Sequence, residues 1–528
     1  MNRLSYTKRP RNFKSFSTVI VFFSFQLLIS FGVYSQFVNI MIDNTDDCNE
    51  PSIVCDPENS DVLVAGANIN KVYVSTDGGL TWKKDYLDSK YGVWGDPCIV
   101  VDTNSNFFYF HLSNYKNGHW IDRIVCQKLE PPYTKWSEGT GIGYNGSKDQ
   151  DKEWACVDRA NNNIYVAWTQ FDDYGSSNPS DSSVILFSKS VDNGASWSDA
   201  IRISQFAGDC RDSDMTTEGA MPCVGINGEI FVVYSFDSKI FIDKSIDNGA
   251  SWLAEDIVIS NQHGGWDYTV PGIYRTNGMP VIASDLSKGP YRGTIYVNWT
   301  DQSKGPENTD VWVSKSIDGG LNWSEPLRVN DDNTSTHQFL SWMTIDQTTG
   351  YVYFVFYDRR NYTDSRTDVY LAYSTDGCKS FENIKISETP FNPNPYVFFG
   401  DYTNIVAHNG RVIPVWARMD DEINSIWTTI IDKITDSKTF FFNSANLISD
   451  IYTQSSGTTT VVLNINNPEK YSMFLFDIYG RQVESFFKDK FLGKGKNYYD
   501  FNNSKFSRGL YVVLIKTNKG IDRKKIFF

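Results

Sequence analysis

The chain has 528 residues, enough for a large repeat array or for more than one domain. Hydrophobic residues make up 41% and charged residues 21%, a composition that excludes a disordered chain. Residues 37–432 carry 29 Lys and Arg against 55 Asp and Glu, a net charge of −26. So acidic a surface repels phosphate backbones, and we expect no nucleic-acid partner.

Residues 1–35 predict a signal peptide. The apolar run "VIVFFSFQLLISFGV" (19–33) leads to "VYS" just before Gln36, a plausible cleavage point. Lys8, Arg9, Arg11 and Lys14 form a basic region before the run. The run is shorter than the ~20 residues that a membrane span needs, which favours cleavage over an anchor. We therefore expect an exported protein, secreted or on the cell surface, without a transmembrane span in the mature chain.

Short alternating apolar runs such as "KVYVS", "NIYVAW", "TIYVNW" and "YVYFVF" dominate the chain up to residue 432. Alternation with a period of two predicts strands, and the frequent Asn, Gly, Asp and Ser between the runs predict tight turns. No segment shows a long apolar period of 3.6 residues. The pattern therefore indicates an all-β protein.

One octet, Ser-x-Asp-x-Gly-x-x-Trp/Phe, recurs five times. Its copies are "STDGGLTW" (75–82), "SVDNGASW" (190–197), "SIDNGASW" (245–252), "SIDGGLNW" (316–323) and the weaker "STDGCKSF" (374–381). Their aspartates are Asp77, Asp192, Asp247, Asp318 and Asp376. The Asp can accept hydrogen bonds from its own turn, the Gly permits a positive φ, and the aromatic ring can cover the join between strands. We expect a structural staple rather than an active site.

Octet spacing counts the repeat units. The gaps between aspartates are 115, 55, 71 and 58 residues, so the first gap holds a unit without an octet, at 95–139. A last unit without an octet follows at 399–432. Three or four antiparallel strands in each unit predict a β-propeller over 36–432, with seven blades favoured and six possible. The strand "FVNIMI" (37–42) could complete the last blade and lock the ring.

The octet resembles the Asp-box, or BNR, repeat of the sialidase-like propellers over roughly residues 45–432. The resemblance implies a glycoside hydrolase-like protein acting on glycans, with exo-α-sialidase as one form. In sialidases three arginines clamp the sialic acid carboxylate, an Asp is the acid/base, and a Tyr activated by a Glu is the nucleophile. Arg275, Arg359 or Arg360, and Arg418 could form such a clamp. The (F/Y)-R-I-P motif of sialidases is absent, and no arginine precedes Arg123 in the propeller.

The propeller face opposite the octets collects long polar loops, where binding usually occurs. Catalytic candidates near strand ends are Asp96, Glu153, Glu218, Asp358, Asp401 and Tyr402, with Asp151 and Asp267 as further carboxylates on that face. Substrate-binding candidates are Arg275, Arg359, Arg360, Arg418, Trp154, Trp266 and Tyr268, with Trp94 as a further ring that could stack on a sugar. Each carboxylate taken alone also fits a turn cap or a salt bridge.

Two other functions stay open. The propeller could bind a glycan or a protein without catalysis. It could also be a polysaccharide lyase, because His111 and His119 flank one loop, and a His with a Tyr can abstract a proton α to a uronic carboxylate. We expect no required cofactor, although Ca²⁺ could bind among the acidic loops.

Eight cysteines in an exported chain make disulfides possible, and the closest pairs, Cys48/Cys55 and Cys210/Cys223, are the best candidates. A small buried side chain is an equally good interpretation for Cys156 and Cys223.

The sequence pattern changes after a predicted linker at 433–445. Short strands over 446–528 predict a small sandwich, and "LFDIYGRQV" and "GLYVVLIKTNKG" resemble the C-terminal sorting domain of type IX secretion in Bacteroidetes. The resemblance implies an interaction with that machinery and passage through the outer membrane, followed by release or surface attachment. A carbohydrate- or cell-surface-binding sandwich is the alternative.

Overall fold

The computed structural model describes residues 37–116, 118–432, 447–453, 457–477, 481–517 and 520–528. The predicted signal peptide (1–35) and linker (433–445) lie outside these ranges. Within them all regular structure is β, apart from one short 3-10 turn, η1 (Asn503–Lys505). No helix in the same ranges is long and apolar enough to cross a membrane.

Seven antiparallel sheets follow one another along the chain, and each is a blade of four sequential strands or a close variant. Blade 1 comprises β2 (Ser52–Cys55), β3 (Leu63–Ala67), β4 (Lys71–Ser75) and β5 (Lys83–Tyr86). Blade 2 comprises β6 (Cys98–Val101), β7 (Phe107–Asn114), β8 (Trp120–Leu129) and β9 (Thr140–Ile142). Blade 3 comprises β10 (Asp149–Asp158), β11 (Asn163–Phe171), β12 (Ser183–Ser190) and β13 (Ile201–Arg202). Blade 4 comprises β14 (Glu218–Val224), β15 (Ile230–Phe236), β16 (Lys239–Ser245) and β17 (Ile257–Asn261).

An inserted hairpin separates blade 4 from the last three blades. It is formed by β18 (Asp267–Tyr268) and β19 (Thr276–Asn277). Blade 5 comprises β20 (Val281–Ser284), β21 (Ile295–Asp301), β22 (Asp310–Ser316) and β23 (Leu327–Arg328). Blade 6 comprises β24 (Gln338–Asp346), β25 (Tyr351–Asp358), β26 (Asp368–Ser374) and β27 (Glu382–Lys385). Blade 7 comprises β28 (Asn404–His408), β29 (Arg411–Asp420), β30 (Ile423–Thr429), β31 (Ile431–Asp432) and β1 (Asn39–Asp43).

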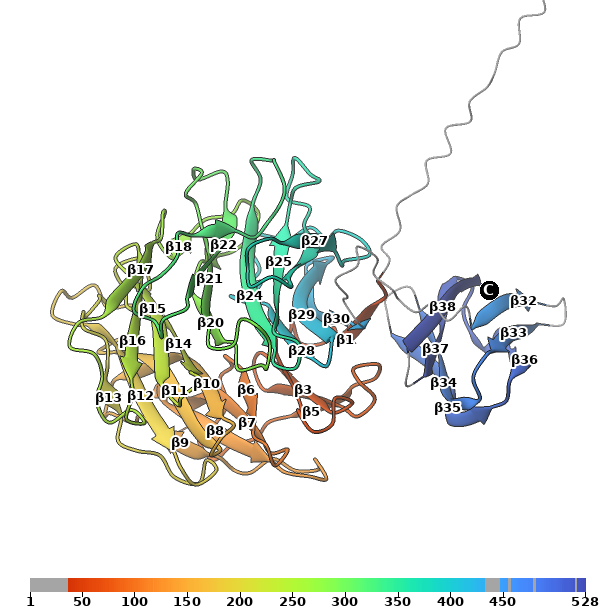
Figure 1. Cartoon of the computed structure of the whole chain (residues 1–528), viewed down its shortest axis with the longest axis horizontal. Helices are drawn as coiled ribbons and strands as arrows, with labels where there is room; N and C mark the ends of the chain where they lie inside the picture. Colours follow the sequence, from red (N-terminus) through yellow and green to blue (C-terminus); the bar gives the residue numbers. More distant parts are fainter. Residues whose placement is uncertain (1–36, 117, 433–446, 454–456, 478–480, 518–519) are drawn as a thin grey trace, which may run out of the picture. The chain divides into compact units, whose positions relative to one another are not determined.

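The blades close into a ring (Figure 1). The first strand of each blade contacts the first strand of the next, and β28 of blade 7 contacts β2 of blade 1. Strand β1 is the outer partner of β30, with Asn39 opposite Thr429 and Met41 opposite Trp427. Both the seven-blade count and the N-terminal closing strand are therefore confirmed. Closure removes the exposed sheet edge that an open array would leave.

Aromatic side chains fill the spaces between blades. Trp168, Trp299 and Trp416 stand near the ends of second strands and are almost fully buried. Buried indole N–H groups need acceptors, and Trp168 Nε1 donates to Gln150 Oε1 at 2.7 Å while Trp299 Nε1 donates to Asp301 Oδ2 at 3.0 Å. The high aromatic content thus serves the propeller core.

The octets lie between the third and fourth strands of five blades. In every copy the aspartate accepts a hydrogen bond from the serine two residues earlier and from the backbone N–H four residues later. In the copy at 316–323, the backbone and side-chain amides of Asn322, with Ser316, lower the pKa of Asp318 to about 2. Trp323 Nε1 donates back to Gly320 O at 3.1 Å. The octet carboxylates are thus engaged within their own turns.

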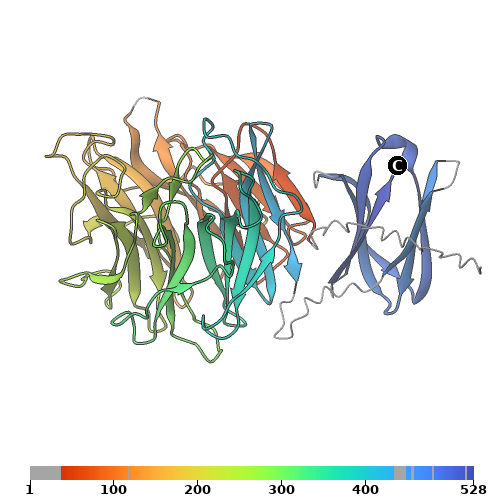
Figure 2. The ribbon, with the colours of Figure 1, turned by 90° about the horizontal axis from the view of Figure 1, so that it is seen from above.

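The C-terminal domain has two antiparallel sheets that face each other (Figure 2). One sheet has the order β32-β33-β36 and the other β35-β34-β37-β38. Their bounds are β32 (Ile448–Thr453), β33 (Thr458–Ile465), β34 (Glu469–Asp477), β35 (Gln482–Leu492), β36 (Gly495–Asn502), β37 (Leu510–Thr517) and β38 (Gly520–Phe527). Val461, Leu475 and Val513 are fully buried in one apolar cluster between the sheets. The predicted sandwich is confirmed.

The two predicted disulfides are absent, because all eight cysteines are free thiols. The Cys48 thiol lies 3.6 Å from Asp43 O and 3.8 Å from Asn424 O. The Cys223 sulfur instead pairs with Ser284 Oγ at 3.2 Å. Nearness in sequence was therefore a poor guide, because these thiols are directed at other partners.

Candidate functional site

The first strands of several blades begin with the same unusual backbone conformation. Glu50, Asp96 and Lys152 have φ values of 51°, 54° and 54°, in the left-handed region that non-glycine residues rarely adopt. Leu340 takes this position in blade 6 and Gly219 in blade 4. β-Bulges follow Asp151, Glu218 and Phe339 at the same level. This repeated kink brings side chains of different blades together near the ring axis, where strain is often retained for function.

Lys152 is the centre of the resulting cluster. Its ammonium lies 2.6 Å from Asp401 Oδ2, 3.3 Å from Asp96 Oδ2 and 3.8 Å from Glu50 Oε1. The residue is only 6% exposed, and these carboxylates raise its pKa well above the ordinary value although burial alone would lower it. Lys152 is therefore a charged, fully paired cation.

Arg275 binds the cluster from the inserted hairpin. Its Nε donates to Asp401 Oδ1 at 2.8 Å, its Nη2 donates to Asp401 Oδ2, and Nη1 lies 3.3 Å from Asp212 Oδ2. Burial alone would raise the pKa of Asp401, but Arg275 and Lys152 hold it well below the ordinary value. Asp401 is thus a permanent carboxylate with both oxygens engaged, which suits it to positioning the two cations.

Three carboxyl groups beside this ion-pair network favour the protonated form. Burial, together with the charge of Asp96, raises the pKa of Asp151 to about 8. Burial and the neighbouring Asp151 raise the pKa of Glu218 well above its ordinary range, and burial and Asp96 do the same for Glu153. Among the residues that the structure describes, neither oxygen of Glu153 has a hydrogen-bond partner, and Glu218 Oε1 also lacks one. Ionised and protonated carboxyls therefore lie side by side, as acid–base chemistry requires.

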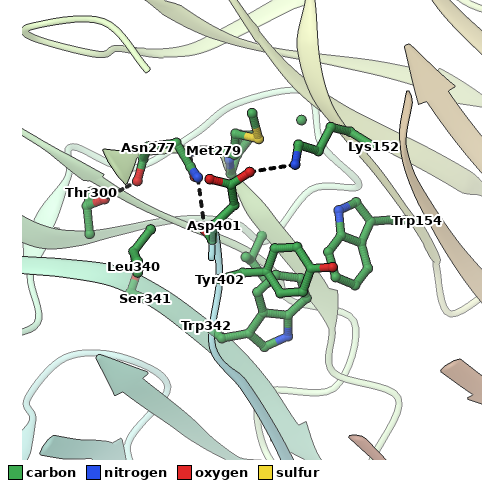
Figure 3. A pocket seen from close by; sticks show the side chains of 13 residues that line it. Lys152, Trp154, Asn277, Met279, Thr300, Leu340, Ser341, Trp342, Asp401 and Tyr402 are labelled. Atoms are coloured by element: carbon green, nitrogen blue, oxygen red, sulfur yellow. Dashed lines mark hydrogen bonds and ion pairs between the residues drawn. The ribbon is translucent and has the colours of Figure 1, made fainter. Parts of the chain in front are cut away.

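A pocket lies beside the cluster at the ring axis (Figure 3). Asp401 stands between Lys152 and Asn277, whose side-chain amide donates to Asp401 O at 2.9 Å. Tyr402, Trp154 and Trp342 form an aromatic group at the same pocket, with the two indole centroids 4.4 Å apart. The Tyr402 hydroxyl is buried without a hydrogen-bond partner. The pocket thus combines ions with an apolar wall.

The structure brings together only part of the predicted site. The residues that meet at the axis are Asp96, Asp151, Glu153, Glu218, Arg275, Asp401, Tyr402 and Trp154. Trp266 and Tyr268 are buried in the base of the inserted hairpin, where Tyr268 OH bonds Thr300 Oγ1 at 2.6 Å and Trp266 Nε1 donates to Thr216 O. Asp267 is exposed on that hairpin.

The other three predicted arginines and Asp358 make their contacts away from the axial carboxylates. Arg360 pairs with Asp358, whose pKa burial raises to about 6. Arg418 pairs with Asp420 on its own strand and donates to Thr389 O. Arg359 is buried, donating to Pro271 O at 2.5 Å and to Thr367 Oγ1. Their contacts therefore do not form a three-arginine clamp with Arg275.

Sequence reasoning missed Lys152, Glu50 and Asp212. Lys152 is flanked by predicted carboxylates, but a single lysine in a polar loop gave no reason to choose it. A signal did exist for Glu50, because "NEPSI" (49–53) repeats the acidic-Pro start of "GDPCI" (95–99) in the next blade. Asn68 joins these two starts, donating to Glu50 and accepting from Asp96 N at 2.9 Å.

The two histidines have different surroundings. His111 is buried against Gln127, and burial lowers its pKa to about 4. His119 is half-exposed and lies 2.6 Å from Asp149 Oδ1. Asp149 also accepts from Tyr174 N at 2.7 Å, so His119 lies near Tyr174.

No set of three or more His, Cys, Asp or Glu residues in the described ranges is arranged to hold a metal ion.

Comparison with known families identifies the C-terminal domain. Residues 457–528 match the family model described as "Secretion system C-terminal sorting domain". These residues are a type IX sorting domain. The sorting domain implies an interaction with the secretion machinery, and the protein is a secreted or cell-surface protein. The match confirms the sequence prediction for the tail.

No curated protein matches the chain. Among solved structures, a protein of unknown function from Dyadobacter fermentans is 10% identical and covers 74% of this chain and 97% of its own, with a TM-score of 0.42. The NanB sialidase of Streptococcus pneumoniae is 9% identical and covers 65% and 69%, with a TM-score of 0.43. The α-L-arabinofuranosidase Arb93A of Fusarium graminearum is 11% identical and covers 75% and 98%, also with 0.43. The chain is thus distantly similar in fold to sialidase and other glycosidase propellers.

Proposed function

We propose that the protein is a secreted or cell-surface glycoside hydrolase that cleaves glycans at the axial cluster. The observation that carries this proposal is the pairing of Asp151, a buried carboxyl that keeps its proton near neutral pH, with Asp96, a neighbouring carboxylate held by Lys152. Glycoside hydrolysis needs one carboxylic acid and one carboxylate at the same bond. The pocket beside these carboxylates is lined by Trp154, Trp342 and Tyr402 and has room for a water molecule.

The roles follow from the surroundings of each group. Asp151 donates its proton to the leaving glycosidic oxygen, while the Asp96 carboxylate takes a proton from a water whose oxygen bonds to the sugar carbon. Lys152 pairs with Asp96 and Arg275 fixes Asp401, so both cations act as positioning residues. Glu218 and Glu153, as protonated neighbours, add no charge that would draw the proton from Asp151.

A sialic acid substrate is the less supported form of this function. Of the four arginines considered, Arg275 contacts the axial carboxylates, and it is already paired with Asp401 and Asp212. Arg360 and Arg418 are paired with their own neighbours. A ligand carboxylate would therefore have to displace a protein carboxylate to be clamped by Arg275, Arg360 or Arg418.

Turnover by the purified full chain on neutral, uronic and sialylated glycans tests the proposal. We expect new reducing ends from at least one substrate, and a loss of about 100-fold or more in Asp151→Asn and Asp96→Asn, the range of general acid–base effects. Asp199→Asn, at an exposed site beyond the octet of blade 3, is the matched control and should retain wild-type turnover. Absence of cleavage on the whole panel would refute the hydrolase.

A polysaccharide lyase is the second candidate, favoured by one observation. His119 pairs with Asp149, which also accepts from the backbone N–H of Tyr174, so a histidine base lies near a tyrosine on this face. Elimination leaves an unsaturated uronate without adding water. The same panel separates the two reactions, because an unsaturated product that disappears in His119→Ala would assign the lyase.

A further inference from the structure

An exposed aromatic row leads from the surface to the axial cluster. Trp94 and Trp120 are each 39% exposed, and their ring centroids lie 5.9 Å apart. The Trp120 and Tyr174 centroids lie 5.8 Å apart. The Tyr174 hydroxyl then donates to Asp212 Oδ2 at 2.7 Å, and Asp212 pairs with Arg275. The row therefore ends at Asp212 and Arg275, which belong to the ion-pair network beside the proposed catalytic carboxylates.

The row is held rigidly although its rings face solvent. Trp94 N donates to Leu112 O at 2.9 Å, and Asn114 N donates to Tyr91 O at 3.0 Å, so the segment 91–95 lies flush against β7. A Cβ on Gly92 would come within 2.0 Å of Asn114 O, so only glycine fits this approach. Packing within the fold does not explain why two large indoles on a fixed backbone stay exposed to solvent. Exposed apolar surfaces of this kind mark binding sites.

The charges near the row limit what it can bind. At its inner end the Lys152 and Arg275 cations are both paired with protein carboxylates. His119, beside the row, is paired with Asp149. Because Lys152 and Arg275 are already held by protein carboxylates, an anionic sugar at the inner end would face Asp96, Asp212 and Asp401, whereas a neutral sugar needs only ring stacking and hydrogen bonds to these carboxylates.

We propose that Trp94, Trp120 and Tyr174 bind consecutive sugar units of a neutral polysaccharide and deliver the chain to the axial carboxylates. The substrate class is thus an extended neutral polysaccharide rather than a single terminal acidic sugar. The inference rests on the proposed hydrolase for what happens at the end of the row, but binding along the row is independent of cleavage.

Binding of the full chain to immobilised arabinan, xylan, galactan and mannan tests the inference, with polygalacturonate and polysialic acid as charged probes. We expect retention by at least one neutral polymer and weaker retention by the charged ones. A bound sugar covers an exposed indole and removes its apolar surface from water. Because alanine lacks this surface, Trp94→Ala and Trp120→Ala should each weaken binding about tenfold. Trp120→Phe should recover part of the loss. Tyr396→Ala is the matched control, because Tyr396 is 88% exposed and should leave binding unchanged.

The outcomes separate the two proposals. Asp151→Asn should bind the neutral polymer as tightly as wild type while failing to cleave it. If wild type does not cleave but binding depends on both tryptophans, the hydrolase is refuted and the binding row stands. If binding is unchanged in both tryptophan variants, or is found only with charged polymers or with none, the row is refuted, whatever the result for cleavage.

Discussion

Replacing Asp151 by asparagine should stabilise the propeller at high pH and change its stability little near pH 4. The pKa of Asp151 is about 8 in the folded protein against an ordinary value of 3.8, because the group is buried beside Asp96. Below pH 4 the carboxyl is protonated in both states. As pH rises from 4 to 8 the unfolded chain loses this proton while the folded protein retains it, so wild type loses stability throughout this window.

The magnitude follows from the same two values. Each pH unit in the window corresponds to about 1.4 kcal/mol, so the whole interval gives an upper bound of ~6 kcal/mol for this one group. Asparagine cannot ionise, and its amide oxygen can still accept the hydrogen bond that Lys152 N gives to Asp151 Oδ1 at 2.9 Å. The advantage of the variant over wild type should therefore grow between pH 4 and pH 8 by about 2–5 kcal/mol.

Denaturant unfolding followed by tryptophan fluorescence measures this difference. All 15 tryptophans lie between Trp82 and Trp427, so the signal reports the propeller and not the sorting domain. Asp199→Asn serves as the control and should follow wild type at each pH. The assignment of Asp151 as a buried acid would be refuted if the difference in free energy of unfolding between variant and wild type does not change with pH. It would also be refuted if the variant becomes less stable relative to wild type as pH rises.

Three other outcomes follow from the structure. Lys152→Met should lower the free energy of unfolding by ~3–5 kcal/mol at pH 7, because Asp401 and Asp96 lose a buried counterion. The double variant with Asp401→Asn should recover part of the loss. An unaltered denaturation midpoint by fluorescence in the single variant would contradict the ion network. Asp376→Ala should lower the free energy of unfolding by ~1–2 kcal/mol in the same assay, because the hydrogen bonds from Ser374 and Ser380 are lost. Glycan turnover should be unchanged. Lost turnover in a folded variant would mean that the octet has a chemical role. Titration of the unfolded, unreduced protein with a thiol reagent should count eight free thiols. Reductant should leave the melting temperature of the folded protein unchanged. A count below eight would reveal a disulfide.

The propeller could be predicted from the sequence because its repeat is tied to local chemistry. Each octet fixes one turn between a third and a fourth strand, so five copies located five blades. The blades at 95–139 and 399–432 were found from spacing and alternation alone. The closing strand at Asn39–Asp43 could be predicted because a ring leaves the outer edge of its last blade to be covered.

The axial site could be predicted only in part, because its members meet across the whole ring. Asp96 and Asp401 were chosen for their places at strand starts, and they converge because seven strand starts share one end of the ring. Lys152 was missed because its role depends on a left-handed backbone that the sequence does not announce.

Arg360 and Arg418 were chosen wrongly as neighbours of Arg275 for a reason visible in the sequence. Each has an aspartate two residues away, Asp358 and Asp420, and residues two apart share one side of an extended chain. Such local pairs satisfy the guanidinium before any distant group can. Arg275 has no such partner in its hairpin and reaches the axis instead.

Cleavage of neutral polysaccharides by wild type and Asp151→Asn, side by side, tests the central claim most directly. The account predicts that wild type releases reducing ends from at least one neutral polymer, and that the folded variant binds that polymer but cleaves it about 100-fold more slowly or worse. Equal cleavage by the two proteins, or none by wild type, would contradict it.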